Sequence, residues 1–135
     1  MMRDAFIPLD WADGTYAFRL GWGELAELQE KCDAGPYVIL DRLQGRQWRI
    51  EDISNTIRLG LIGGGMEPVK ALKLVRKYVE ARPPVENLIY AVGILSAGLM
   101  GAPDEPSGEQ GAPNQIETSS TIFPTESSDL APSTD

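Results

Sequence analysis

The most constraining feature of this chain is a run of glycines that follows an apolar stretch. Residues 57–68 read Ile-Arg-Leu-Gly-Leu-Ile-Gly-Gly-Gly-Met-Glu-Pro. Each glycine inside a helix costs about 1 kcal/mol relative to alanine, so three in succession end the helix that the apolar residues predict. Pro68 suits the first turn of a following helix, where its missing N–H is not needed. The sequence therefore predicts a sharp bend between two helices at Gly63, Gly64 and Gly65, which supply backbone freedom, including positive φ.

Apolar residues recur at helical spacing on both sides of this bend. We expect two helices before it, over about residues 23–33 and 37–43, and a third that ends at the bend. A fourth follows the bend, and the pair Pro83-Pro84 separates it from a fifth over about residues 85–100. The stripes of the third and fourth helices are Ile50, Ile53, Ile57 and Leu61, and Ala71, Leu72, Val75, Tyr78 and Val79.

Two short extended segments precede the helices. Residues 5–9 and 16–20 flank Asp13-Gly14, a dipeptide typical of hairpin turns. Phe6 gives the first strand an apolar side, and Tyr16, Phe18 and Leu20 do so in the second. The predicted fold class is therefore mainly α: an N-terminal β-hairpin followed by about five short helices, which together form one domain over residues 1–101.

The remaining residues, 102–135, are rich in Pro, Ser, Thr, Gly and acids, and such a composition predicts a disordered tail. The chain has a formal charge of −8, but seven of its 20 acids lie beyond Gly101, where there is no Lys or Arg. The domain is thus close to neutral, which gives no electrostatic argument for nucleic acid or for an anionic membrane surface. The longest apolar run is shorter than the ~20 residues of a membrane span, so we expect a soluble protein.

The sequence offers little for catalysis or metal binding. It has no histidine and one cysteine, Cys32, which argues against a zinc site and against a Cys-His nucleophile. The glycine run is not followed by Gly-Lys-Ser/Thr, as a phosphate-binding loop would be. Cys32 lies on an apolar stripe and is predicted to be a buried structural thiol, while Glu51 and Asp52 fit the first turn of a helix better than a catalytic pair. We expect no enzyme activity, no cofactor, no metal and no small-molecule substrate.

Three features suggest contacts with other proteins. Lys70, Lys73, Arg76 and Lys77 share one side of the fourth helix, which is either a solvated face or a docking face for an acidic partner, including the chain's own tail. Among Trp11, Trp22 and Trp48, which are expected to anchor the core, Trp22 stands at a strand-to-helix corner where partial exposure is expected. The fifth helix is apolar nearly all round, so it is either central to the core or covered by a partner, and self-association is expected.

Residues 16–29, Tyr-Ala-Phe-Arg-Leu-Gly-Trp-Gly-Glu-Leu-Ala-Glu-Leu-Gln, and the run that ends in three glycines also carry a family resemblance. Together with the apolar helix that ends Ala-Gly-Leu-Met-Gly at residue 101, they resemble the small tail proteins of gene transfer agents and long-tailed phages of alphaproteobacteria. The resemblance covers about residues 10–101. It implies a protein that is encoded between the tail tube and the tape measure genes and is similar to tail assembly chaperones.

By this resemblance the chain would bind the tape measure protein in the cytoplasm of the producing cell and help to recruit tail tube protein. The alternatives are a structural tail tube or minor tail component, which the family has also been described as, and a host-directed regulatory adaptor. Partner binding is expected around the fifth helix and the glycine bend. The residues concerned are Trp22, Ile62, Met66, Ile89, Val92, Leu95 and Leu99.

Overall fold

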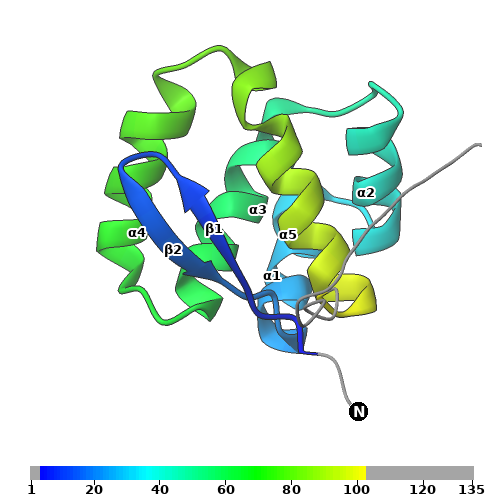
Figure 1. Ribbon diagram of the computed structural model, residues 1–135. Helices are drawn as coiled ribbons and strands as arrows, with labels where there is room; N and C mark the ends of the chain where they lie inside the picture. The colour runs from blue at the N-terminus through cyan, green and yellow to red at the C-terminus, as the bar shows by residue number, and fades with distance from the viewer. Residues whose placement is uncertain (1–3, 103–135) are drawn as a thin grey trace, which may run out of the picture. The chain divides into compact units, whose positions relative to one another are not determined.

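The computed structural model describes residues 4–102 as a β-hairpin followed by helices, and thus confirms the predicted fold class (Figure 1). The predicted disordered tail lies outside the described residues. In chain order the elements are β1 (Ile7–Trp11), β2 (Gly14–Phe18), α1 (Trp22–Cys32), α2 (Pro36–Gln44), α3 (Ile50–Gly63), α4 (Pro68–Val75), the π-helical turn η1 (Arg76–Glu80), the 3₁₀ turn η2 (Pro84–Asn87) and α5 (Leu88–Met100).

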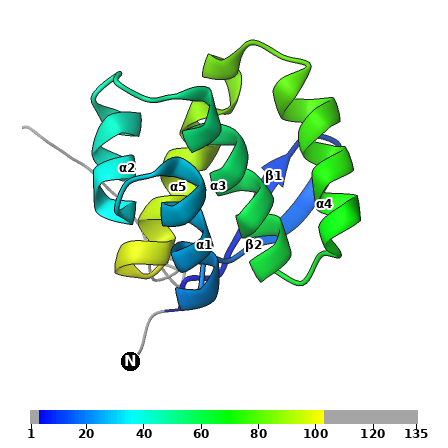
Figure 2. The ribbon, with the colours of Figure 1, turned by 180° about the vertical axis from the view of Figure 1, so that it is seen from behind.

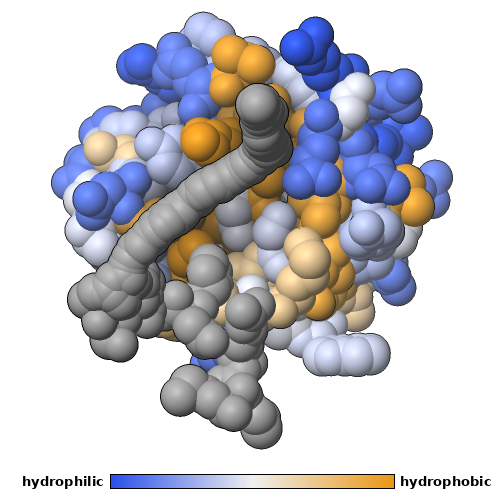
Figure 3. Space-filling view, turned by 45° about the vertical axis from the view of Figure 1, so that its right-hand side comes forward, coloured by the Kyte–Doolittle hydropathy of each residue, from blue (hydrophilic) through white to orange (hydrophobic). Residues whose placement is uncertain are grey.

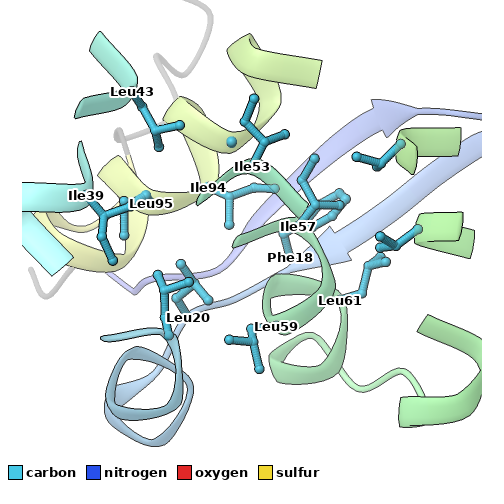
Figure 4. Close-up of a cluster of buried hydrophobic side chains, with 14 of the residues drawn as sticks. Phe18, Leu20, Ile39, Leu43, Ile53, Ile57, Leu59, Leu61, Ile94 and Leu95 are labelled. Carbon is cyan, nitrogen blue, oxygen red and sulfur yellow. The ribbon is translucent and has the colours of Figure 1, made fainter. Parts of the chain in front are cut away.

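Helix α3 is the centre of the domain. It packs against α1, α4, α5 and strand β2, and seen from behind it lies between α1 and α4 (Figure 2). The core forms where these elements meet, around the fully buried side chains of Phe18, Ile57 and Ile94 (Figure 4). A helix surrounded in this way needs apolar residues on most of its circumference, which the sequence of α3 supplies.

The hairpin turn is displaced by one residue from its predicted place. Trp11 pairs with Gly14, so the two-residue loop is Ala12–Asp13 and not Asp13-Gly14, and Ala12 takes a positive φ of 58°. The prediction for Phe6 is also wrong, because this side chain precedes β1 and is 42% exposed. The inward side of β1 ends instead in Trp11, whose larger apolar surface is worth more when buried.

Trp11 joins the hairpin to the second half of the domain. Its ring makes edge contacts with Tyr16, Phe18 and Tyr78 at centroid distances of 5.6, 5.8 and 6.0 Å. The indole Nε1 donates a hydrogen bond of 2.8 Å to the side chain of Asn87, whose Nδ2 donates in turn to the Tyr78 carbonyl at 2.9 Å. The predicted core role of Trp11 is confirmed, and its polar atom is satisfied as a buried indole requires.

The glycine bend is present, but its three residues serve different purposes. Only Gly65 has a positive φ, of 112°. A Cβ atom on Gly63 would overlap the carbonyl oxygen of Arg19, and one on Gly64 would overlap that of Ala17. Two of the three glycines are therefore required because β2 and the segment after it lie directly against the end of α3, and the expectation of backbone freedom holds for Gly65.

A further glycine belongs to the same contact. A Cβ atom on Gly60 would lie 2.9 Å from Cγ2 of Ile94 and 3.1 Å from Cδ1 of Phe18. The Gly60 carbonyl also accepts a hydrogen bond of 2.9 Å from the backbone N–H of Arg19. Residues spaced i, i+3 and i+4 share one side of a helix. We call this side, made by Gly60, Gly63 and Gly64, the glycine face of α3.

The predicted stripes are mostly buried, with one exception at the start of α3. Ile50 is 60% exposed, while Ile53, Ile57 and Leu61 are buried. Ile50 is the first residue of the helix, and burial begins at Asp52, so the prediction for this residue is wrong. In the fourth helical segment Ala71, Val75 and Val79 face the core, and Leu72 and Tyr78 are half-buried.

The acids at the start of α3 have a structural role. Asp52 is fully buried, accepts hydrogen bonds of 3.1 and 2.7 Å from the Arg42 guanidinium, and accepts another of 2.9 Å from the backbone N–H of Arg49. This bidentate pair ties α2 to the first turn of α3. The interpretation of Asp52 as a helix-start residue is confirmed, and the contact with Arg42 adds a tertiary connection to it.

Candidate interaction surface

Helix α5 has one buried side and one exposed apolar side. Ala91, Ile94 and Leu95 are fully buried against the rest of the domain. The opposite side carries Ile89 and Met100, which are 74% and 58% exposed. Figure 3 shows hydrophobic residues gathered near the middle of the side of the molecule on which α5 lies toward the viewer. We call the exposed side the α5 face, and it comprises Ile89, Val92, Gly93, Ser96 and Met100.

The glycine in the middle of this face has no packing reason within the domain. A Cβ atom on Gly93 would meet no other heavy atom within 4 Å, whereas one on Gly98 would lie 2.9 Å from Cβ of Leu20. Gly98 is thus required by its neighbour, while Gly93 costs about 1 kcal/mol of helix stability without an internal contact in return. A small residue on an exposed helix side lets another backbone approach closely. Gly93 therefore marks the α5 face as a surface suited to close contact with a second protein.

A hollow of about 530 Å³ lies at the C-terminal end of α5. Trp22, the first residue of α1, lines it from one side, and Ala97, Gly98 and Gly101 line it from the other. Trp22 is 91% exposed, which confirms the expected exposure at this corner and exceeds it. A large, exposed aromatic side chain beside a hollow is typical of residues that anchor protein interfaces. The fold thus brings Trp22 to the end of α5, which the sequence did not show.

The other predicted partner-binding residues fall into three places. Val92 and Leu99 are half-buried on α5. Val92 belongs to the α5 face, and Leu99 lies next to it. Leu95 is fully buried, so it belongs to the core and not to this surface. Ile62 and Met66 are half-buried at the glycine bend, where Met66 lines a separate hollow of about 380 Å³. The structure therefore groups Trp22 with α5 and leaves the bend as a second, separate location.

The α5 face is uncharged, because α5 contains no acidic or basic residue. By contrast, Lys70, Lys73, Arg76 and Lys77 are all exposed on α4 and η1. The two surfaces therefore offer different chemistry: an apolar contact at α5, and an electrostatic one at α4 and η1.

The described residues show no candidate metal site, and their one thiol is buried. Among residues 4–102 no group of His, Cys, Asp and Glu could hold a metal ion, and no helix there is long and apolar enough to cross a membrane. Cys32 is buried, as predicted, and its Sγ lies 3.6 Å from the Glu51 carbonyl. Burial raises the pKa of the Cys32 thiol to about 12, so the thiol stays protonated and unreactive near neutral pH.

Comparison of the sequence with known protein families finds a match over most of the chain. Residues 5–119 match the family described as phage tail tube protein, GTA-gp10. The chain belongs to this family. The match covers the hairpin, the glycine bend and the whole of α5, and it confirms the expected kinship with gene transfer agent and phage tail proteins. No curated protein and no solved structure matches the chain.

Membership of this family makes the protein a phage-type tail protein whose partners are other tail proteins. The family is one of structural proteins, which agrees with the expectation of a non-enzymatic role. Its description names the tail tube and not a chaperone of the tape measure, so it supports the structural alternative better than the chaperone hypothesis.

Proposed function

We propose that this protein is a structural component of the tail tube of a phage or gene transfer agent particle, and that it acts only through contacts with other tail proteins. The family description supports the tube assignment. The observation that carries the mode of action is the α5 face, where Ile89 and Met100 are exposed around the open position of Gly93. A subunit of an assembly needs such an apolar surface, which is covered only after assembly.

The energy available at this surface is adequate for a protein contact. Full burial of one aliphatic side chain contributes about 1.5–3 kcal/mol. Ile89, Met100 and Trp22 each have most of their side-chain surface still exposed to solvent. An occupant that covers all three would gain several such contributions. The absence of charge on α5 avoids a desolvation penalty at Ile89 and Met100, while the hollow beside Trp22 also includes the ion pair of Asp4 and Arg19.

Quantitative mass spectrometry of purified particles tests this proposal. A tube component is expected in the particle in many copies, in a fixed ratio to the other tube proteins. Ile89→Lys and Met100→Lys are expected to keep the domain folded and to remove the protein from particles, since they place charges on the apolar contact. Absence of the wild-type protein from intact particles would overturn the structural assignment.

The second candidate is a chaperone that binds the tape measure protein in the cytoplasm of the producing cell and helps to recruit tube protein. The observation that favours it is the spacing of the α5 face, since Ile89, Gly93, Ser96 and Met100 follow one side of a helix and suit an amphipathic helix of a client. Co-expression separates the candidates. A chaperone keeps the tape measure soluble, loses this ability in Ile89→Lys, and is missing from the finished particle.

A host-directed adaptor is the third hypothesis, and no observation on the described residues favours it. It predicts stable recovery of a host protein when no other tail protein is present. The same purification with Ile89→Lys shows whether such a partner uses the α5 face.

A further inference from the structure

The exposed cations of α4 and η1 form a compact group. Lys70, Lys73, Arg76 and Lys77 are all exposed, within a segment whose buried residues are Ala71, Val75 and Val79. The ion pairs found within residues 4–102 use other cations, namely Arg19, Arg42 and Arg82. We call these four residues the basic face. Lys77 also lies over the ring of Tyr78, with its Nζ 5.3 Å from the ring centroid. The four side chains stay exposed, so the face can meet an acidic surface on another molecule.

Helix α1 presents the opposite charge. Glu27 and Glu30 are exposed, and Asp33 follows them as the C-terminal cap. Lys31 is the one cation of the helix, so the exposed side stays net acidic. Glu24 is half-buried and accepts a hydrogen bond of 2.9 Å from the backbone N–H of Gly21. We call the exposed side, with Glu27, Glu30 and Asp33, the acidic face.

The two faces lie on opposite sides of the domain. Helices α1 and α4 both pack on α3, which lies between them in Figure 2. Leu28 and Cys32 are the buried residues of α1, and Ala71 and Val75 are those of α4. Because the charged side of each helix is opposite its buried side, the acidic and basic faces point away from α3 in different directions. One copy therefore cannot join its own two faces, but two copies can.

We propose that the basic face of one copy binds the acidic face of the next, head to tail. Contacts between two different surfaces of one chain propagate, and they close into rings or continue as helical filaments. This inference rests on the proposed role in the tail tube. It assigns the contact between copies of this chain to the basic and acidic faces and leaves the α5 face for contact with other tail proteins. The occupant is a second copy because α1 carries the complementary charge on the domain itself. Binding of the basic face to the acidic residues beyond Gly101 of the same copy, which leaves the protein monomeric, would overturn this choice.

The test uses the full chain and two neutralised variants. One is Lys70→Gln, Lys73→Gln, Arg76→Gln and Lys77→Gln together, and the other is Glu27→Gln with Glu30→Gln. Analytical ultracentrifugation and native mass spectrometry report the oligomeric state over a concentration series. Lys31→Gln is the matched control, because it removes a cation from the acidic face and is expected to preserve or strengthen association.

We expect the wild-type protein to form assemblies larger than a dimer at low salt and to dissociate at about 1 M salt, where charges are screened beyond about 3 Å. Each neutralised variant alone is expected to be monomeric. An equimolar mixture of the two variants retains one intact interface, so it forms a 1:1 heterodimer and nothing larger. A wild-type protein that grows beyond a dimer, together with a mixture that stops at a heterodimer, separates a head-to-tail contact from a symmetric one.

A wild-type protein that is monomeric at every salt concentration would overturn the inference, as would neutralised variants that assemble like the wild type. Binding of a different tail protein or of nucleic acid to the basic face of a monomer would overturn the choice of a second copy. The particle measurement is independent. If the purified protein assembles in a salt-dependent way but is absent from particles, only the tube role is contradicted. If the protein is abundant in particles but shows no head-to-tail contact in solution, only this inference is contradicted.

Discussion

The end of α3 and the exposed side of α5 both carry glycines, but only those of α3 are covered. Gly60, Gly63 and Gly64 lie against β2 and the segment after it, and a Cβ atom on any of them would collide with a neighbour. Gly93 faces open space. Glycines of the first kind are required for folding, since two backbones share the space. Gly93 lowers the stability of its helix and makes no close contact within the domain that requires a glycine, which indicates a role in contact with another molecule.

The largest expected effect is at the glycine face. Gly64→Val forces the valine side chain onto the backbone of β2 at Ala17. We therefore expect the free energy of unfolding to fall by about 4 kcal/mol or more, which few single substitutions cause. Urea denaturation followed by circular dichroism measures this loss. Gly65→Ala is the matched control, because its position is open and only its positive φ is strained, for about 1–2 kcal/mol. Equal losses for both variants would contradict the assigned contact.

The two sides of α5 are expected to respond differently to truncation. Leu95→Ala removes a fully buried side chain and should lower the free energy of unfolding by about 2–5 kcal/mol. Ile89→Ala removes a mostly exposed one and should change it by less than about 0.5 kcal/mol. Binding to tail partners should be weakened by Ile89→Ala under conditions where both variants are folded. A large stability loss for Ile89→Ala would show that this side is not a free surface.

Substitution of Gly93 should separate folding from association. Gly93→Ala is expected to raise the free energy of unfolding by about 1 kcal/mol, because the position is open and alanine favours the helix. Gly93→Leu should also fold, and its larger side chain should block close approach of a partner. Thermal unfolding measures the first effect and pull-down with tail proteins the second. Unchanged binding by Gly93→Leu would remove Gly93 from the interface.

The smallest effect concerns Cys32, the last residue of α1. Its buried thiol lies 3.6 Å from the Glu51 carbonyl, at the start of α3. Its pKa of about 12 predicts very slow alkylation by iodoacetamide at pH 8 in the folded protein and rapid alkylation in urea. Because the pKa of Cys32 in the folded protein exceeds the ordinary thiol value of 9.0, the unfolded state releases its proton first as pH rises. The contribution of Cys32 to stability should therefore be constant below pH 9 and should fall above it. Rapid alkylation of the folded protein would contradict this burial.

The parts of the fold that were predicted correctly depend on local pattern. The third and fourth helices follow from apolar spacing, and the bend between them follows from three successive glycines. The turn at Ala12–Asp13 was placed one residue late, because the burial of Trp11 decided the strand register and outweighed the preference of Asp-Gly. The exposure of Ile50 was missed because periodicity does not show where a helix enters the core.

The candidate surface was predicted only in part. Ile89 and Trp22 were named from the sequence, but nothing local shows that the two ends of α5 and α1 share one hollow. Leu95 was included because an all-round apolar helix gives no indication of which side is buried. The spacing of Gly60, Gly63 and Gly64 at i, i+3 and i+4 was the available signal for a helix side that contacts another backbone.

By itself the sequence determined that this is a mainly helical domain with a hairpin at its start and that it has no histidine and one cysteine, because helix signals and composition are local properties of the chain. It also determined that the chain bends sharply at Gly63–Gly65. Only the tertiary structure decided which glycines are required by a neighbouring backbone, which side of α5 stays exposed, and that the acidic and basic helices face away from each other. These properties depend on contacts between residues far apart in the chain, which no local pattern encodes.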